Sequence, residues 1–357
     1  MSFIHCGNIS KYSLLYIVYS ICSIMNIKLT SQNKKNYNSD ENIKLSAVFI
    51  LLMFISEFLS GMIGIGYLCL SKYCNKPNNN EEYEILNINN MNQSSIMDNP
   101  IGQECHKKWI KIIFVCIFDS IYTFVSIYDW NLQKIVLTIK SFLLLFTAIF
   151  SSFYLKYTMY RHHIAGIGIV IFGTIINDIL FYKKILDIDF ILLFSVQLIN
   201  AWEQILEKDL IEINFLGIYE LLAIEGIIGF VFSIVIIQIF FSFEKIKQIG
   251  IEIILIFLVS CGVYNICRLK IIQIYGPIHR CVGDNFVIFI LWIIDLYDDK
   301  YFELDDICHV IGYICCIIGS IIFTEMISIS LCNLNINTKK EQIKRAVKKL
   351  EIHNFLL

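Results

Sequence analysis

Two stretches of the chain share one pattern, and this pattern decides the expected fold. Residues 163–173 read HIAGIGIVIFG, and residues 309–319 read HVIGYICCIIG. His163, Gly166 and Gly173 of the first stretch recur as His309, Gly312 and Gly319 of the second, always 146 residues later. An internal repeat explains this spacing. Chance is the alternative, because one histidine and two glycines recur easily in an apolar background.

The composition predicts a membrane protein. Apolar residues make up 57% of the chain, charged residues 17%, and the mean hydropathy is +0.65. Soluble domains usually have about 45–50% apolar and about 25% charged residues. The apolar runs are continuous and long enough to cross a bilayer as helices, whereas a β-barrel needs short alternating segments. The expected fold class is therefore an all-α membrane protein.

Ten apolar runs are candidates for transmembrane helices. They lie near residues 11–30, 46–70, 109–128, 132–153, 163–182, 186–206, 218–241, 249–269, 275–295 and 307–331. Each copy of the repeated pattern closes a block of five runs. Because five is odd, the second block enters the membrane from the opposite side, which predicts two inverted five-helix repeats.

The predicted organisation has three parts. Residues 1–182 form the first repeat, with an Asn-rich loop at about 72–106 that is expected to be disordered, and residues 183–331 form the second repeat. Residues 332–357 form a basic tail, which the positive-inside rule places in the cytoplasm. Ten spans would place both termini on that side.

The glycines are expected to serve close packing of helices. This role is assigned to Gly166, Gly173, Gly226, Gly229, Gly312 and Gly319. A phosphate-binding glycine loop is disfavoured because these glycines lie within apolar spans. The adjacent His162 and His163 would point about 100° apart on a helix, which makes them poor joint metal ligands. We expect no metal, no cofactor and, at a net charge of −2, no nucleic-acid partner.

Three ionisable residues lie in the middle of predicted spans, where charge is costly and marks a functional candidate. They are Glu57 in the second run, Asp119 in the third and Lys140 in the fourth. We expect Lys140 to pair with Asp119 or Glu57. A purely structural ion pair and a substrate or proton site are both open interpretations.

The sixth run has the richest polar face. Gln197, Asn200 and Gln204 follow helical spacing and would line one side of a cavity, where they could hydrogen-bond a polar substrate. Glu203 and Glu207 are expected nearer the cytoplasmic end, exposed to solvent.

Two later runs complete the candidate substrate cavity. Glu225 precedes the packing glycines Gly226 and Gly229 in the seventh run. Arg280 and Asp284, four residues apart in the ninth, can bridge within one helix or engage an anion or counter-ion.

At these residues the chain resembles the drug/metabolite transporter superfamily, and more closely the F subfamily of solute carrier family 35, which is similar to nucleotide-sugar transporters. The similarity rests on MFISEFLS, FTAIFSSFYL, QLINAWEQILEKDL, AIEGIIGF, RCVGDNFVIFILW, HVIGYICCIIGS and FTEM, in this order. It implies the drug/metabolite transporter fold and an antiporter-like carrier of endomembranes. Val287 stands where relatives tend to have a second basic residue, which argues against a strongly anionic substrate.

The leading hypothesis is a secondary transporter that moves a small polar metabolite across an organelle membrane of the Golgi, ER or lysosome/vacuole type. No nucleophile with an adjacent base and no Walker loop occurs, so we expect neither an enzyme nor an ATP-driven pump. The expected partners are the lipid bilayer, the substrate, a coupling proton or counter-substrate, and a second copy of the chain. The alternative is a non-transporting scaffold or regulator that keeps the carrier fold.

Overall fold

The computed structural model describes residues 3–34, 39–74, 101–128, 142–181, 188–240, 250–299 and 304–324. These ranges contain ten helices and no strands. The helices are α1 (Phe3–Lys34), α2 (Ser39–Cys74), α4 (Ile101–Tyr128), α6 (Phe142–Phe153), α7 (Arg161–Phe181), α8 (Ile188–Glu212), α9 (Ile218–Phe240), α10 (Ile251–Tyr275), α11 (Pro277–Asp299) and α12 (Leu304–Phe323). The prediction of an all-α fold is confirmed.

Each of the ten predicted apolar runs overlaps one helix. In the part of the chain that the structure describes, four helical segments are long and apolar enough to cross a membrane, as an integral membrane protein requires. They are Leu45–Ser71 of α2, Ile218–Gln238 of α9, Ile251–Tyr275 of α10 and Pro277–Ile294 of α11. Lys140, most of the Asn-rich loop and the basic tail lie outside the described residues.

The break between α10 and α11 shows how local sequence sets the helix ends. Gly276 adopts a φ of +99°, in the region that favours glycine, and its N–H donates to the carbonyl of Ile272 at 3.0 Å. Pro277 then occupies the first position of α11, where its missing N–H costs no helical hydrogen bond. This tight junction carries the chain from Arg268 on α10 to Arg280 on α11.

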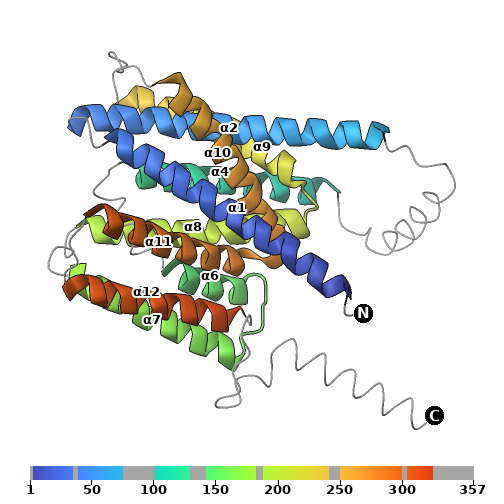
Figure 1. Ribbon diagram of the computed structural model, residues 1–357. Coiled ribbons are helices and arrows are strands. Elements are labelled where there is room, and N and C mark those ends of the chain that lie inside the picture. Colours follow the sequence, from blue (N-terminus) through green and yellow to red (C-terminus); the bar gives the residue numbers. More distant parts are fainter. Residues whose placement is uncertain are drawn as a thin grey trace, which may run out of the picture.

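The two helices that carry the repeated pattern, α7 and α12, pack directly against each other (Figure 1). They run antiparallel, because Gly166 of α7 meets Gly319 near the end of α12 and Gly173 meets Gly312. A Cβ atom on Gly166 would lie 2.7 Å from the carbonyl oxygen of Gly319, closer than real Cβ contacts. Small residues are therefore required on this face.

Helices α2 and α9 form a second close pair, at the opposite edge of the bundle in Figure 1. A Cβ on Gly226 would lie 2.8 Å from the carbonyl oxygen of Phe54, and one on Gly229 would overlap the Phe54 ring. The neighbouring residue Glu225 is thereby held within electrostatic reach of Glu57 on α2.

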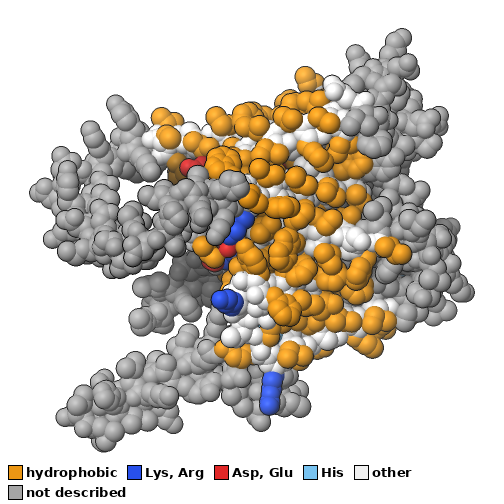
Figure 2. All heavy atoms as spheres, turned by 180° about the vertical axis from the view of Figure 1, so that it is seen from behind, with side chains coloured by type: hydrophobic (Ala, Val, Ile, Leu, Met, Phe, Trp, Pro, Cys, Tyr) orange, Lys and Arg blue, Asp and Glu red, His pale blue; other side chains and the backbone are white. Residues whose placement is uncertain are grey.

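The distribution of side chains is typical of a membrane protein. Ile63, Leu255 and Val259 are among many large apolar side chains that face outwards, and Figure 2 shows hydrophobic side chains over most of the described surface on one face. Many charged and amide side chains, in contrast, are buried between the helices. An apolar exterior around a polar interior is favourable in lipid, where charge is costly at the surface that faces the acyl chains.

Candidate functional site

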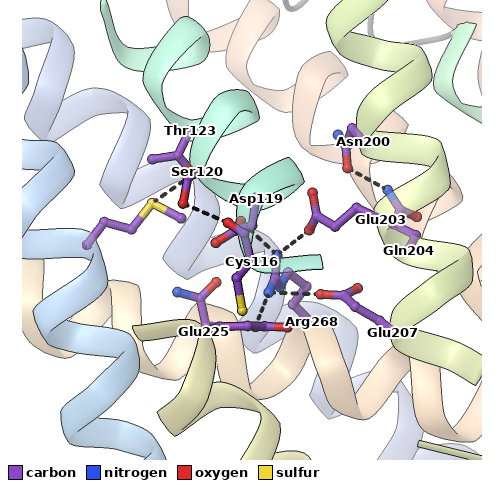
Figure 3. A network of polar contacts seen from close by, with 12 residues as sticks. Cys116, Asp119, Ser120, Thr123, Asn200, Glu203, Gln204, Glu207, Glu225 and Arg268 are labelled. Carbon is purple, nitrogen blue, oxygen red and sulfur yellow. Dashed lines mark hydrogen bonds and ion pairs between the residues drawn. The ribbon is translucent and has the colours of Figure 1, made fainter. Parts of the chain in front are cut away.

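A buried arginine on α10 is the centre of the polar interior. Arg268 Nη1 lies 3.1 Å from Glu203 Oε1 and 3.5 Å from Asp119 Oδ1, and its Nη2 lies 3.0 Å from Glu207 Oε1 and 3.1 Å from Glu225 Oε2. Figure 3 shows these four carboxylates converging on the guanidinium. They come from α4, α8 and α9, so Arg268 ties the distant α4 to three consecutive helices, α8, α9 and its own α10.

A second arginine extends the group to α11. Arg280 Nη1 lies 3.4 Å from Glu207 Oε2, so that Glu207 bridges the two arginines. Asp284 accepts a hydrogen bond from the hydroxyl of Tyr19 on α1, at 2.5 Å. Both members of the predicted Arg280–Asp284 pair thus make contacts with other helices.

Glu57 of α2 completes the group. It is fully buried and lies within electrostatic reach of Asp119, Arg268, Glu203 and Glu207. Neither of its carboxylate oxygens has a hydrogen-bond partner among the described residues. We call Glu57, Asp119, Glu203, Glu207, Glu225, Arg268 and Arg280 together the Arg268 cluster. The predicted pairing with Lys140 falls outside the described residues; among those described, Asp119 meets the guanidinium of Arg268.

The predicted polar face of α8 lies inside the bundle. Gln204 Nε2 donates to Asn200 Oδ1 at 3.0 Å, and the Cys281 thiol of α11 donates to Gln204 Oε1 at 3.4 Å. Gln197 is also fully buried, but neither its oxygen nor its nitrogen has a hydrogen-bond partner among the described residues. Among the described residues, the hydrogen-bonding groups of this face are therefore satisfied only in part.

The expectation that Glu203 and Glu207 are solvated is wrong. Both are fully buried, and both contact Arg268. The physical reason is twofold: α8 continues to Glu212 instead of ending at residue 206, and the arginines of α10 and α11 face these carboxylates. Neither effect can be seen within α8 alone.

Arg268 is a central residue that the sequence patterns do not single out, although it lies within the predicted eighth run. The predicted run ends at residue 269 and so places Arg268 at a membrane edge, where arginine is common. The apolar residues that follow, Ile271 and Ile272, belong to the same helix and are fully buried. This continuation of the apolar pattern was the available signal.

A cavity of about 400 Å³ lies elsewhere in the fold, and none of its lining residues belongs to the Arg268 cluster. It is bordered by the start of α7 and the junction of α10 and α11, and the polar groups in its lining include Tyr157, Tyr160, His163, Tyr275 and His279. His163 Nδ1 accepts the backbone N–H of Tyr160 at 3.0 Å, which gives this histidine a local capping role. Within the described ranges, no group of three or more His, Cys, Asp or Glu side chains is arranged to hold a metal ion.

Replacing Gln197 by leucine tests whether its amide is kept for something other than stability. Since the buried amide has no partner among the described residues, Gln197→Leu should leave the melting temperature unchanged or raise it. The matched variant Gln204→Leu breaks the hydrogen bond to Asn200 and should destabilise the protein by about 1–3 kcal/mol. Thermal unfolding in detergent measures both, and a larger loss for Gln197→Leu than for Gln204→Leu would show that Gln197 has a structural partner.

Comparison with known proteins supports the fold but gives no identity. A solved structure described only as "Crystal structure of protein" is similar to this chain, with a TM-score of 0.55, 11% sequence identity, and coverage of 89% of this chain and 97% of that chain. No protein-family model and no curated protein matches the sequence. At 11% identity the similarity concerns the fold alone.

Proposed function

We propose that this protein is a secondary transporter that moves a small polar metabolite across an organelle membrane by alternating access. The observation that carries the proposal is the Arg268 cluster, seven ionisable side chains that are at most 2% exposed. Ionisable groups inside a membrane helix bundle are costly and mark pathways for substrates or ions. The cluster joins Glu57 and Asp119 from the first half of the chain with residues of α8 to α11 from the second half, so relative movement of the halves would open it.

The packing of the helices supports two inverted repeats. The five helices of the first repeat, α1, α2, α4, α6 and α7, correspond in this order to α8, α9, α10, α11 and α12 of the second. If each helix is replaced by its counterpart, the contact between α1 and α10 becomes the contact between α8 and α4, and the contact between α2 and α10 becomes the contact between α9 and α4. All four of these contacts occur, and the pairs α2–α9 and α7–α12 map onto themselves. The glycine contacts follow the same exchange, because an offset of 146 residues converts Gly166–Gly319 into Gly312–Gly173. Such a relation is typical of transporters with a central site.

On this proposal the protein has ten spans and the drug/metabolite transporter fold, as its resemblance to solute carrier family 35 implies. It would lie in an endomembrane with both termini in the cytoplasm. The scaffold alternative depends on the basic tail, residues 332–357, which lies outside the described residues.

The direct test is uptake by proteoliposomes that contain the purified full-length protein. A panel of labelled nucleotide sugars, amino acids, peptides and organic cations should include a solute that enters saturably. Glu207→Gln should lower this uptake by about tenfold or more, because Glu207 bridges the two arginines. Glu212→Gln, on the same helix with a half-exposed side chain, is the matched control and should transport like the wild type.

Unchanged uptake in Glu207→Gln would show that the cluster is not the transport site. A correctly folded protein that moves none of the solutes would contradict the transporter proposal and favour the scaffold.

A further inference from the structure

The Arg268 cluster holds more acids than bases. Five carboxyl groups (Glu57, Asp119, Glu203, Glu207 and Glu225) share two guanidinium groups (Arg268 and Arg280). An ionised carboxylate removed from water without a partner is so unfavourable that it takes up a proton or pairs with a cation. The described residues of the cluster therefore leave three carboxyl groups more than there are guanidinium groups to pair with them.

The excess is most evident at Glu57. Among the described residues, the titratable and charged groups that face it are Cys116 and Asp119 of α4, Glu203 and Glu207 of α8, Glu225 of α9, and Cys261 and Arg268 of α10. Arg268 is the one cation in this set, and its guanidinium already contacts four other carboxylates. Within the part of the chain that the structure describes, Glu57 thus faces more acidic groups than Arg268 can neutralise.

Unpartnered hydrogen-bond acceptors provide an independent observation. Five buried oxygen atoms have no hydrogen-bond partner among the described residues: both carboxylate oxygens of Glu57, Oδ1 of Asn265, Oε2 of Glu203 and Oε1 of Glu225. Asn265 lies on the Glu57 side of α10, because its amide donates to Cys261 Sγ at 3.6 Å and Cys261 is within electrostatic reach of Glu57. An ammonium or guanidinium group has only donors, so it matches such a set of acceptors.

We infer that the Arg268 cluster binds a cationic substrate with an ammonium or guanidinium group, and that it releases protons when this substrate enters. The inference rests on the proposed transport function and names the substrate class and the coupling ion. For each positive charge of the substrate that enters, one carboxyl group loses its proton to the water on the side where the site is open, so the net charge of the site stays the same. An anion is disfavoured because Arg268 and Arg280 are already engaged by carboxylates.

The test measures proton release from the purified full-length protein in weakly buffered detergent with a pH indicator. The cationic probes are agmatine and spermidine, and the anionic probes are UDP-glucose and glutamate. We expect protons to appear when a cationic probe is added, and none with the anionic probes. The affinity for the cation should rise about tenfold per pH unit for each proton displaced.

Glu57→Gln assigns the effect to the cluster. Because neither Glu57 oxygen has a hydrogen-bond partner among the described residues, the melting temperature should stay the same, while cation affinity falls about tenfold or more and proton release decreases. Glu212→Gln should keep both properties. If Glu57→Gln does not fold, Glu225→Gln takes its place with the same expectation for affinity and proton release.

Binding of UDP-glucose or glutamate, but of neither cation, would overturn the inference and leave the transport function standing. Cation binding without proton release, or with an affinity independent of pH, would also overturn it. If no probe of either charge binds and no solute of the uptake panel is moved, the proposed function itself fails.

Discussion

Replacing Arg268 by glutamine is expected to abolish the proposed transport and to lower the stability of the protein. Four carboxylates lie within 3.5 Å of the Arg268 guanidinium. Removing one partner of a buried ion pair typically costs about 3–5 kcal/mol, because the remaining charge is left uncompensated. Uptake by proteoliposomes and thermal unfolding in detergent measure the two effects.

The neighbouring Lys270 supplies the control. It lies two residues along α10, is only half-buried, and its ammonium is 5.9 Å from the centre of the Tyr219 ring. Lys270→Gln removes the same charge from the same helix and should change uptake and melting temperature little.

Arg268→Lys should recover part of the stability but not the transport, because an ammonium lacks the planar fork that reaches four carboxylates at once. Full transport by Arg268→Gln would contradict the central role of this residue.

Adding a single methyl group to Gly166 is expected to disrupt the contact between α7 and α12. In Gly166→Ala the new Cβ would lie 2.7 Å from the Gly319 carbonyl oxygen and 2.9 Å from the backbone of Phe323. Since backbone atoms cannot rotate away, the helices have to separate, and overpacking of this kind costs about 1–3 kcal/mol. Combining it with Gly173→Ala, which meets the Gly312 carbonyl, should increase the loss. The measurement is the melting temperature in detergent.

Gly168 offers a control within the same eleven-residue stretch. A Cβ there would meet nothing within 4 Å, so Gly168→Ala should leave the melting temperature unchanged or raise it slightly through better helix propensity. Equal melting temperatures for Gly166→Ala and Gly168→Ala would show that the close approach of α7 and α12 does not limit stability.

The candidate site was predictable only in part. Glu57, Asp119, Glu225 and Arg280 could be identified because an ionisable residue amid apolar residues stands out in any sequence. Arg268 and Glu207 could not be ranked above other charges, since both lie near the ends of predicted runs. Their burial depends on how far α8 and α10 continue and on which helices face them. Boundaries are the least certain part of any sequence-based assignment.

The sequence by itself determined that the chain is helical and where each helix lies, because continuous apolar runs with three prolines in 357 residues favour long helices. It also identified Gly166, Gly173, Gly312 and Gly319, which prove to be the contact between α7 and α12. Only the tertiary structure decided which carboxylates share Arg268. Helices far apart in the chain meet there, and the charge balance of a buried site is a property of all the groups it gathers, which no single stretch of sequence contains.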